Sequence, residues 1–224
     1  MRELKEVRFT NRIQVTLALS VGILMITVIS AIALVLYFAT DQVIKENART
    51  ANQSLIQQVN YDIEYYLRNI EITLDGLRFS SEVESYFKES NEENTRQVVG
   101  YIASLLENRE DMINIVLIKP DGSVITNDQE KKVKENVDFL KESYYVDAVS
   151  KEAMVVSPSH VQNILIGQYQ WVVSCSRIFR DPNDGEILGV ILVDLNFSLI
   201  EDMVSRISLG ERGYIFIVDE FGEL

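Results

Sequence analysis

One charged residue interrupts an apolar segment near the end of the chain. Asp194 follows Gly189–Val193 and precedes Leu195. A carboxylate inside such a strand loses its hydration, and this costs free energy unless hydrogen bonds or an opposite charge replace the lost water. We therefore expect a functional role for Asp194, with a buried structural partner as the alternative interpretation.

The other side chains that could do chemistry are few. The 224 residues include one histidine, His160, and one cysteine, Cys175. Neither a histidine-based metal cluster nor a Cys–His pair can therefore be assembled from spaced motifs. Cys175 lies in the apolar run Trp171–Phe179 and is predicted to be a small core residue. The chain has no glycine-rich phosphate loop, and its carboxylates are scattered over polar faces. The sequence predicts no catalytic residue, no metal and no cofactor.

The charge distribution excludes nucleic acid as a partner. The net charge is −13, and residues 1–12 contain four basic and two acidic side chains, which leaves −15 on the remainder. A nucleic-acid-binding surface needs a basic patch, and a surface this acidic also repels anionic lipid.

An uncharged segment of 28 residues, 13–40, determines where the rest of the chain lies. At about 1.5 Å per residue it is longer than the roughly 30 Å hydrocarbon core of a bilayer, so we predict one transmembrane helix. One alternative is the buried core helix of a soluble protein. The other is a cleaved signal peptide, but Tyr37 lies where a cleavage site requires a small residue.

The flanking basic residues predict the orientation of this helix. Residues 1–12 contain four lysine or arginine residues, whereas the stretch of similar length after the helix contains Lys45 and Arg49. Because basic residues favour the cytoplasmic side, residues 1–12 are predicted to be cytoplasmic, and residues 41–224 to lie outside the plasma membrane.

Residues 41–78 are predicted to continue as a stalk helix. Apolar or small side chains recur every three or four positions from Ile44 to Leu77, and neither glycine nor proline occurs between Asp41 and Asp75. This spacing is typical of an amphipathic helix, whose apolar stripe must be covered. We expect it to pack on the following domain, on a second copy of the chain in a homodimer, or on both.

Residues 79–207 are predicted to form an α+β module with an antiparallel sheet. Apolar and β-branched runs predict strands at 113–118, 123–126, 153–157, 169–179 and 187–196. Turn residues at 120–122 and 181–185 favour hairpins. Helices are predicted after a capping box at Ser90–Glu93, over 137–148 and over 197–207. Residues 80–90 are predicted to interrupt the helical pattern.

A partial internal repeat predicts the start of a second module. Ile115–Ile118 aligns with Ile215–Val218 at an offset of 100 residues, and Gly122 aligns with Gly222. Both copies read as strand, turn and strand, although any β-hairpin would give a similar match. We expect residues 208–224 to begin a second, incomplete module, and the chain to be a fragment of a longer protein.

Two short motifs accompany this order of membrane helix, stalk and PAS-like sheet. Gly-Val-x-x-x-Asp occupies 189–194, and Gly-x-x-Gly-Tyr occupies 210–214. Together they resemble the double Cache extracellular sensor, over residues 41–224 and with the membrane-distal module complete. The stalk sequence Asp62–Ile70 is similar to that of bacterial sensor histidine kinases that carry this input domain.

The resemblance implies a function that spacing alone does not show. A small molecule binds in the distal module, the stalk and the transmembrane helix shift, and a cytoplasmic output responds. In a two-component sensor histidine kinase, the catalytic part would follow residue 224 and act on a cytoplasmic response regulator. A methyl-accepting chemoreceptor and a diguanylate cyclase are the alternatives. A membrane-anchored structural or adhesion protein, which needs no pocket, belongs to a different class.

The family's pocket implies five ligand-binding candidates, which are Tyr144, Tyr145, His160, Trp171 and Asp194. Aromatic walls with a few polar groups suit a small ligand, and Asp194 would hold its amine or hydroxyl through a charge-assisted hydrogen bond. Core packing is the alternative interpretation for Tyr144 and Trp171, and a loop position is the alternative for His160.

The chain departs from the amino-acid-binding version of the family at three positions. Glu142 stands where that version has an arginine, two residues before an aromatic pair. His160 and Gln162 stand where it has a tyrosine and an aspartate. Amino acids are therefore disfavoured as ligands, and a sugar, an organic acid, an amine or a peptide remains open.

Overall fold

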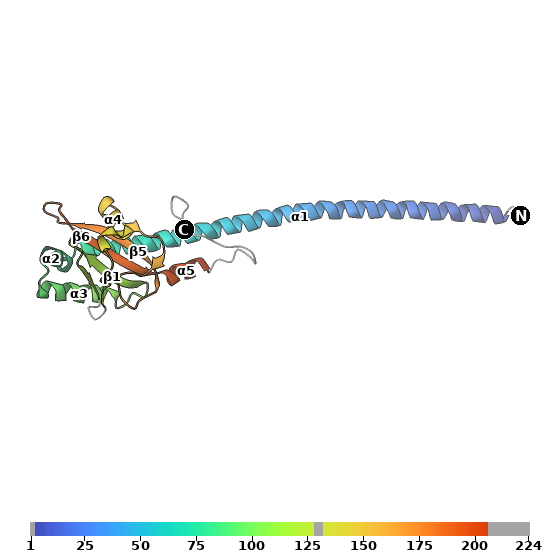
Figure 1. Cartoon of the computed structure of the whole chain (residues 1–224). Coiled ribbons are helices and arrows are strands. Elements are labelled where there is room, and N and C mark those ends of the chain that lie inside the picture. Colours follow the sequence, from blue (N-terminus) through green and yellow to red (C-terminus); the bar gives the residue numbers. More distant parts are fainter. Residues whose placement is uncertain (1–2, 128–131, 206–224) are drawn as a thin grey trace. The chain divides into compact units, whose positions relative to one another are not determined.

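Two compact units make up the chain in its computed structural model, which describes residues 3–127 and 132–205, with side chains from residue 14 onward. Unit 1 is Met1–Gln57 and unit 2 is Gln58–Leu224. Helix α1, Glu3–Arg78, contributes to both units (Figure 1). The predicted second module, residues 208–224, lies outside the described residues and stays a prediction.

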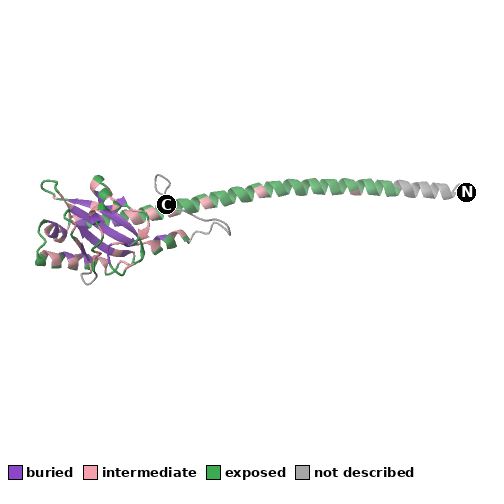
Figure 2. Cartoon of the chain, viewed as in Figure 1, coloured by how far each residue is buried: buried purple, intermediate pink, exposed green. Residues whose placement is uncertain are grey.

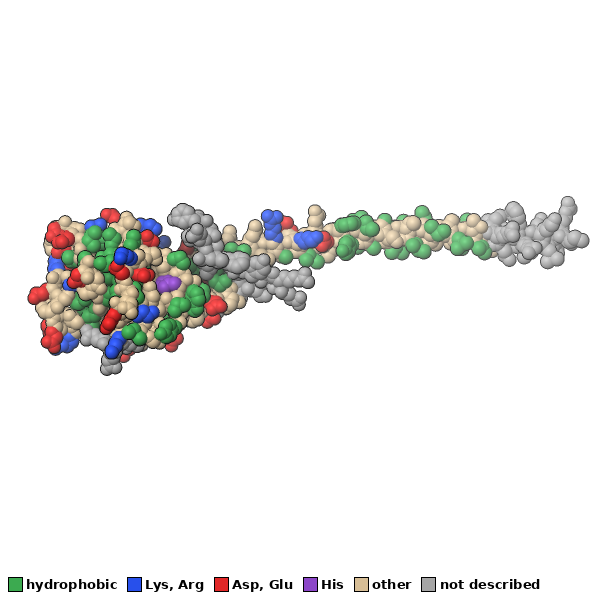
Figure 3. Space-filling view, viewed as in Figure 1, with side chains coloured by type: hydrophobic (Ala, Val, Ile, Leu, Met, Phe, Trp, Pro, Cys, Tyr) green, Lys and Arg blue, Asp and Glu red, His purple; other side chains and the backbone are tan. Residues whose placement is uncertain are grey.

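The described residues of unit 1 belong to α1, and their apolar side chains are uncovered. Large apolar side chains between Val15 and Phe38 are exposed (Figure 2), and Figure 3 shows them along the visible side of the helix. Thr27 Oγ1 donates to two backbone carbonyls of the preceding turn, at 3.1 and 2.8 Å, so it needs no partner outside the helix. α1 is the one helix of the described residues that is long and apolar enough to cross a membrane.

Unit 2 is built on a six-stranded antiparallel sheet. Its strands run in the order β2–β1–β6–β5–β3, and β4 also pairs with β5. The strands are β1 Met112–Ile118, β2 Val124–Thr126, β3 Val155–Val156, β4 His160–Val161, β5 Trp171–Arg180 and β6 Ile187–Asn196. β5 and β6 form the long hairpin that the turn residues at 181–185 predict. The predicted α+β fold with an antiparallel sheet is thus confirmed for the described part of the chain.

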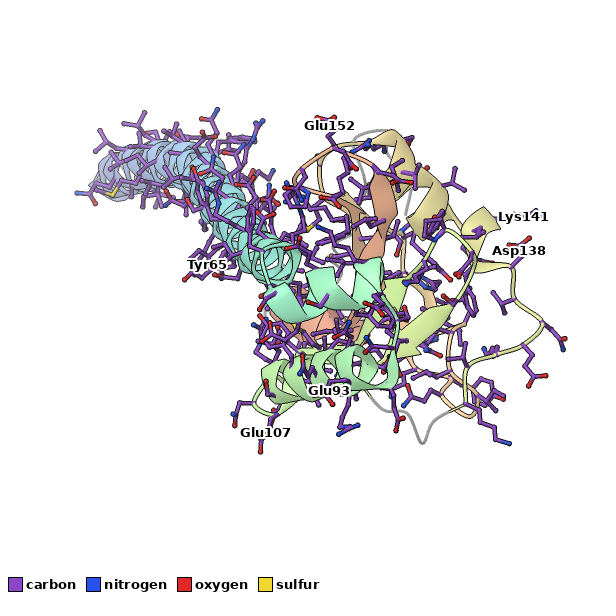
Figure 4. The ribbon with its side chains drawn as sticks, turned by 90° about the vertical axis from the view of Figure 1, so that its left-hand side faces the viewer. Tyr65, Glu93, Glu107, Asp138, Lys141 and Glu152 are labelled. Carbon is purple, nitrogen blue, oxygen red and sulfur yellow. The ribbon has the colours of Figure 1, made fainter. Side chains whose placement is uncertain are left out.

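Helices cover both faces of this sheet (Figures 1 and 4). The helices of unit 2 after α1 are α2 Ser81–Lys88, α3 Glu92–Leu106, η1 Phe139–Lys141, α4 Ser143–Ser150 and α5 Phe197–Ser205. The end of α1, with α2 and α3, packs on one face, and η1 and α4 pack on the other. Because side chains alternate along a strand, Ile115 and Leu117 face the first layer, and Val116 and Ile118 face the second.

The apolar stripe of the stalk is covered at its end and exposed near its beginning. Ile70, Leu74 and Leu77 are fully buried against the sheet and its helices. Ile44 and Leu55 keep 61% and 38% of their surface exposed. The expectation that the stripe packs on the following domain therefore holds for the last turns of α1.

Two helix starts differ from the sequence prediction. Residues 80–90, expected to break the helical pattern, contain α2, whose N-cap Ser80 accepts a hydrogen bond from Val83 N at 3.2 Å. The N-cap of α3 is Asn91, whose Oδ1 accepts from Asn94 N at 2.8 Å, and not Ser90. A helix of eight residues is marginal by propensity, so α2 depends on burial of its apolar face, which no local pattern reveals.

Gly189, the glycine of the Gly-Val-x-x-x-Asp motif, permits a close approach between β6 and the helix layer. It has φ +156° and pairs with Phe179 of β5. A Cβ atom at this position would overlap the ring of Phe87 and the carbonyl oxygen of Ile118. The rings of Phe87 and Phe179 stack with centroids 4.8 Å apart. The motif glycine therefore has a packing role.

Candidate ligand-binding site

Three polar side chains form a row across the middle of the sheet. Asn114 of β1 pairs with Asp194 of β6, which pairs in turn with Ser174 of β5. Ser174 Oγ donates to Asp194 Oδ1 at 2.6 Å, and Asn114 Nδ2 donates to Asp194 Oδ2 at 3.4 Å. All three residues are at most 1% exposed. A buried polar row around a carboxylate, in strands whose other buried residues are mostly apolar, is the strongest candidate for a functional site in the described residues.

Strand alternation places this row on the face that α4 covers. Asp194 shares its side of β6 with Val190 and Leu192, which pack in the core under η1 and α4. Ser176, two residues from Ser174 on β5, donates to the backbone oxygen of Tyr144 in α4 at 2.7 Å. The carboxylate of Asp194 therefore lies on the α4 face.

Burial controls the electrostatics of Asp194. Loss of water raises the pKa of this carboxyl, and the hydrogen bonds from Ser174 and Asn114 and the charge of His160 oppose that shift. Within the described part of the chain, no lysine or arginine forms an ion pair with Asp194. Apart from the charge of His160, the described residues give this carboxylate no opposite charge that would compensate its burial.

Tyr144 lies in α4, on the same face of the sheet as the polar row. It is 3% exposed, and its hydroxyl donates to Asn163 Oδ1 at 3.5 Å. Asn163 Nδ2 donates in turn to Glu142 Oε2 at 3.0 Å. Burial raises the pKa of Tyr144, and the charges of Glu142 and Asp194 raise it further, so the hydroxyl stays a neutral donor. Tyr144 thus lies within electrostatic reach of two carboxylates.

Two buried polar atoms in this region lack a hydrogen-bond partner. Asn114 Oδ1, an acceptor, belongs to the polar row. Gln162 Nε2, a donor, belongs to a residue that is 1% exposed and whose Oε1 accepts from Leu165 N at 3.2 Å. Because buried polar groups in folded proteins are nearly always paired with protein or ordered water, these two atoms are open to a water molecule or to a bound ligand.

His160 lies at the edge of the polar row. Its Nε2 is 3.4 Å from Ser174 Oγ, and its Nδ1 is 3.1 Å from the carbonyl oxygen of Pro158. His160 begins β4 and pairs with Val172, so it occupies a short strand rather than a loop. A strand of two residues is too short to be predicted from its sequence pattern.

Three of the five candidates lie on the same face near the polar row. Tyr145 lies in the same layer without contacting the row, and Trp171 lies on the opposite face of β5. Asp194 belongs to the polar row, His160 lies beside Ser174 of the row, and Tyr144 lies over the same face of the sheet in α4. Tyr145 is 9% exposed in the same apolar layer, and burial raises its pKa, with a smaller contribution from the charge of Asp121 after β1. Trp171 is 55% exposed and lies on the other side of β5, with its ring 6.5 Å from Phe197.

Trp171 lines a separate open hollow of about 690 Å³. The hollow is formed by Ser159, Gln170, Trp171, Asn196, Phe197, Ser198 and Glu201. It contains none of the other four candidates.

Sequence reasoning missed two members of the polar row. Asn114 interrupts the apolar run at 113–118, and this is the kind of signal that identifies Asp194, but an uncharged amide costs less to bury. Ser174 gives no signal, because it is small and uncharged and the same run contains a second serine, Ser176. Among the described residues, no group of three or more His, Cys, Asp or Glu side chains could hold a metal ion.

A family model described as a Cache domain matches residues 39–224. The methyl-accepting chemotaxis protein McpC of Bacillus subtilis (strain 168) is 21% identical over 214 residues. The matched region covers 96% of this chain and 32% of that protein, so the chain spans about a third of this relative's length.

Ligand-binding domains of three chemoreceptors have similar folds. The domain of Campylobacter jejuni Tlp3 in complex with L-valine gives a TM-score of 0.60 at 17% identity, over 72% of this chain and 64% of that one. The domain of Pseudomonas fluorescens CtaA in complex with L-serine gives 0.55 at 16%, over 74% and 66%. The domain of Pseudomonas aeruginosa PAO1 PctC in complex with GABA gives 0.55 at 18%, over 74% and 68%. At these identities the likeness shows a shared fold alone.

Proposed function

Because the chain belongs to the Cache domain family, we propose that it is the ligand-sensing region of a bacterial transmembrane receptor. Residues 13–40 span the plasma membrane, residues 1–12 are cytoplasmic, and residues 41–224 lie outside. A small molecule binds on the α4 face of the sheet in unit 2. α1 carries the resulting change toward the membrane.

The observation that supports this proposal is the buried polar row, with the unpartnered Oδ1 of Asn114 in it. Burying a carboxylate without a lysine or arginine partner costs free energy, and a bound ligand can offset that cost. Asn114 Oδ1 and Gln162 Nε2 add an acceptor and a donor that the described residues leave unused. A polar ligand that reaches Asp194 and these two atoms satisfies all three groups at once.

A route from this site to α1 runs through β5. Ser174 and Ser176 contact the site from one side of the strand. Arg177, on the opposite side, binds Glu71 and Asp75 of α1 at 3.2 and 3.0 Å. A ligand that shifts β5 therefore acts directly on the end of α1. Its effect is limited to its differential affinity for the two states, typically about 1–3 kcal/mol.

The output of the receptor is a separate question. The similarity to McpC favours a methyl-accepting chemoreceptor. A two-component sensor histidine kinase with a cytoplasmic response regulator is the second candidate, and it rests on the stalk sequence Asp62–Ile70. The first residues after 224 in the complete gene distinguish the two, because a methylated coiled hairpin and a phosphoacceptor helix with an ATP-binding domain have different sequences.

Replacing Asp194 by asparagine tests the site. A panel of amino acids, amines, sugars and organic acids would be screened by thermal shift on the full chain in detergent, and affinity measured by calorimetry. We expect Asp194→Asn to weaken the bound compound about 10- to 100-fold, since a charge-assisted hydrogen bond is lost.

The same substitution is expected to leave the ligand-free chain at least as stable. Burial raises the pKa of Asp194, so its ionised form is the unfavourable one in the folded state. This destabilisation of the folded state is present at pH values above the pKa of the group in the unfolded chain, near 4. It disappears at lower pH, where the carboxyl is neutral in both states. Asp202→Asn, on exposed α5, is the matched control for binding. Unchanged affinity in Asp194→Asn, or no binding across the whole panel, would contradict the proposal.

We also propose a homodimer through α1, supported by its exposed aromatic and aliphatic side chains. Tyr61 and Tyr65 are 70% exposed and Ile72 is 63% exposed, although all three lie in unit 2. Tyr65 points away from the sheet in Figure 4. In a Cys175→Ser background, Tyr65→Cys is expected to form a disulfide-linked dimer in membranes. Lys141→Cys, near α4, is the control expected to stay monomeric, and equal cross-linking of both variants would argue against this interface.

A further inference from the structure

We propose that the open hollow beside Trp171 is a second ligand-binding site, which takes a small neutral sugar in its pyranose form. The inference goes beyond the proposed function, because it concerns the face of the sheet opposite to Asp194. It is carried by an exposed aromatic platform, by the hydrogen-bonding side chains around that platform, and by the lack of basic side chains among the described residues that line the hollow.

The hollow lies where β5 begins and where β6 passes into α5. Trp171 is the first residue of β5, and Asn196 and Phe197 are the last residue of β6 and the first residue of α5. Trp171 shares its side of β5 with Val173, which packs in one core with Ile200 of α5. The volume of about 690 Å³ falls within the roughly 300–1,000 Å³ that is typical of small-molecule sites.

Trp171 and Phe197 form the aromatic part of the hollow. Trp171 is 55% exposed, and its ring centroid lies 6.5 Å from that of Phe197, with 48° between the ring planes. Because tryptophan is on average largely buried in folded proteins, this half-open indole is a favourable surface for another molecule to cover. The negative face of an indole attracts the slightly positive C–H groups on one face of a pyranose ring, so a sugar can stack on it.

Hydrogen-bonding side chains surround this platform. Asn196 Oδ1 accepts from the backbone N and the Oγ of Ser198, at 3.1 and 2.7 Å. These two bonds orient the amide of Asn196 and leave its Nδ2 hydrogens as donors. Glu201 of α5 is exposed and forms no ion pair with another described residue, so its oxygens are available as acceptors. The other polar side chains of the lining are Ser159 and Gln170.

This mixture of donors and acceptors matches sugar hydroxyls. A hydroxyl group donates one hydrogen bond and also accepts, so neighbouring hydroxyls of one ring can pair with an amide and a carboxylate together. A hydrogen bond from a hydroxyl to Glu201 is charge-assisted and therefore stronger than a bond between neutral groups.

Charged ligands use the same lining less well. No described residue of the lining is Lys, Arg or His, so a phosphate or a carboxylate has no positive partner there. A quaternary ammonium could lie against Trp171 near Glu201, but it donates no hydrogen bond and leaves the amide groups unused. A neutral ring with several hydroxyls uses both the aromatic platform and the polar side chains.

Intrinsic fluorescence tests the inference, because Trp171 is the single tryptophan of the chain and reports on this hollow alone. The full chain, in a polyoxyethylene detergent that carries no sugar, would be titrated with glucose, galactose, N-acetylglucosamine, maltose and cellobiose. We expect at least one of them to shift the emission saturably to shorter wavelength, as the indole is covered. Sorbitol, an open-chain polyol without a flat ring face, and choline are expected to cause no shift.

Substitutions locate the bound sugar. Glu201→Gln is expected to weaken it about 10-fold, because a charge-assisted hydrogen bond becomes a neutral one. Asp202→Asn, the exposed neighbour on α5 that does not line the hollow, and Asp194→Asn, on the other face of the sheet, are expected to leave its affinity within about twofold. Trp171→Ala is expected to abolish binding in calorimetry, while its unfolding temperature stays close to that of the parent chain.

Three results would overturn the inference. The first is that none of the five sugars shifts the emission. The second is that choline shifts it in a Glu201-dependent manner while the sugars fail. The third is that the affinity of the sugar falls in Asp194→Asn and not in Glu201→Gln. A compound that depends on Glu201 and not on Asp194 belongs to the hollow and leaves the Asp194 test of the proposed function unaffected, so the two proposals fail separately.

Discussion

Gly189→Ala is expected to destabilise unit 2 by about 2–5 kcal/mol, through overpacking and backbone strain together. The new Cβ would overlap the carbonyl oxygen of Ile118, which cannot move without disturbing the β1–β6 pairing. It would also overlap the ring of Phe87, which is held against Phe179. The φ of +156° adds strain for any residue with a side chain. Both the sheet and the helix layer would have to shift.

Chemical denaturation of the full chain in detergent measures this loss. Gly100→Ala is the matched control, because Gly100 lies inside α3 and a Cβ atom there would meet nothing within 4 Å. Alanine there is expected to be neutral or to stabilise by up to about 1 kcal/mol, through helix propensity. A Gly189→Ala chain as stable as the Gly100→Ala chain would show that β6 and α2 do not pack as described.

A flexible break in α1 is expected to abolish ligand-dependent output while leaving ligand affinity within about twofold. α1 is one helix from Glu3 to Arg78, and its end is held to β5 by Arg177. Seven glycines inserted after Ala51 would cost about 1 kcal/mol each in helix stability relative to alanine, so the helix would be interrupted. The site is built from residues after Glu142 and from Asn114, and it would remain intact.

Output would be measured in cells with the complete receptor, and affinity by calorimetry. Seven alanines inserted at the same place are the matched control, because they add the same length and keep the helix and its apolar phase close to the original. We expect the alanine variant to retain most of its response. Equal responses from both insertions would mean that the signal does not pass along a rigid α1.

The parts of the fold that can be predicted are those whose pattern is local. The sequence predicts a strand over 187–196, and β6 is Ile187–Asn196, because the turn before it and the apolar run within it are both readable in sequence. The sequence does not predict α2, since eight residues carry too little periodicity and its stability comes from Val83 and Phe87 in the core. Short elements that depend on distant contacts leave no local signal.

The site can be predicted in part for the same reason. A charge in an apolar strand identifies Asp194 as the anchor, but its neighbours Asn114 and Ser174 depend on strand register, which brings together residues 20 to 80 positions apart. Strand pairing also explains why Trp171 lies away from the site. It lies three residues from Ser174 on β5, and an odd separation along a strand places the two side chains on opposite faces. Sequence order alone does not show this without the pairing of β5 with β6.

Ligand sensing by this chain requires that the sheet and its Asp194 face lie outside the cell membrane. The most direct measurement is labelling of single cysteines in intact cells with a membrane-impermeant maleimide, in a Cys175→Ser background. Lys141→Cys, at a position that is 83% exposed, is expected to be labelled in intact cells, and Thr10→Cys only after permeabilisation. Labelling of Thr10→Cys in intact cells, with Lys141→Cys protected until the membrane is opened, would contradict the extracytoplasmic sensor.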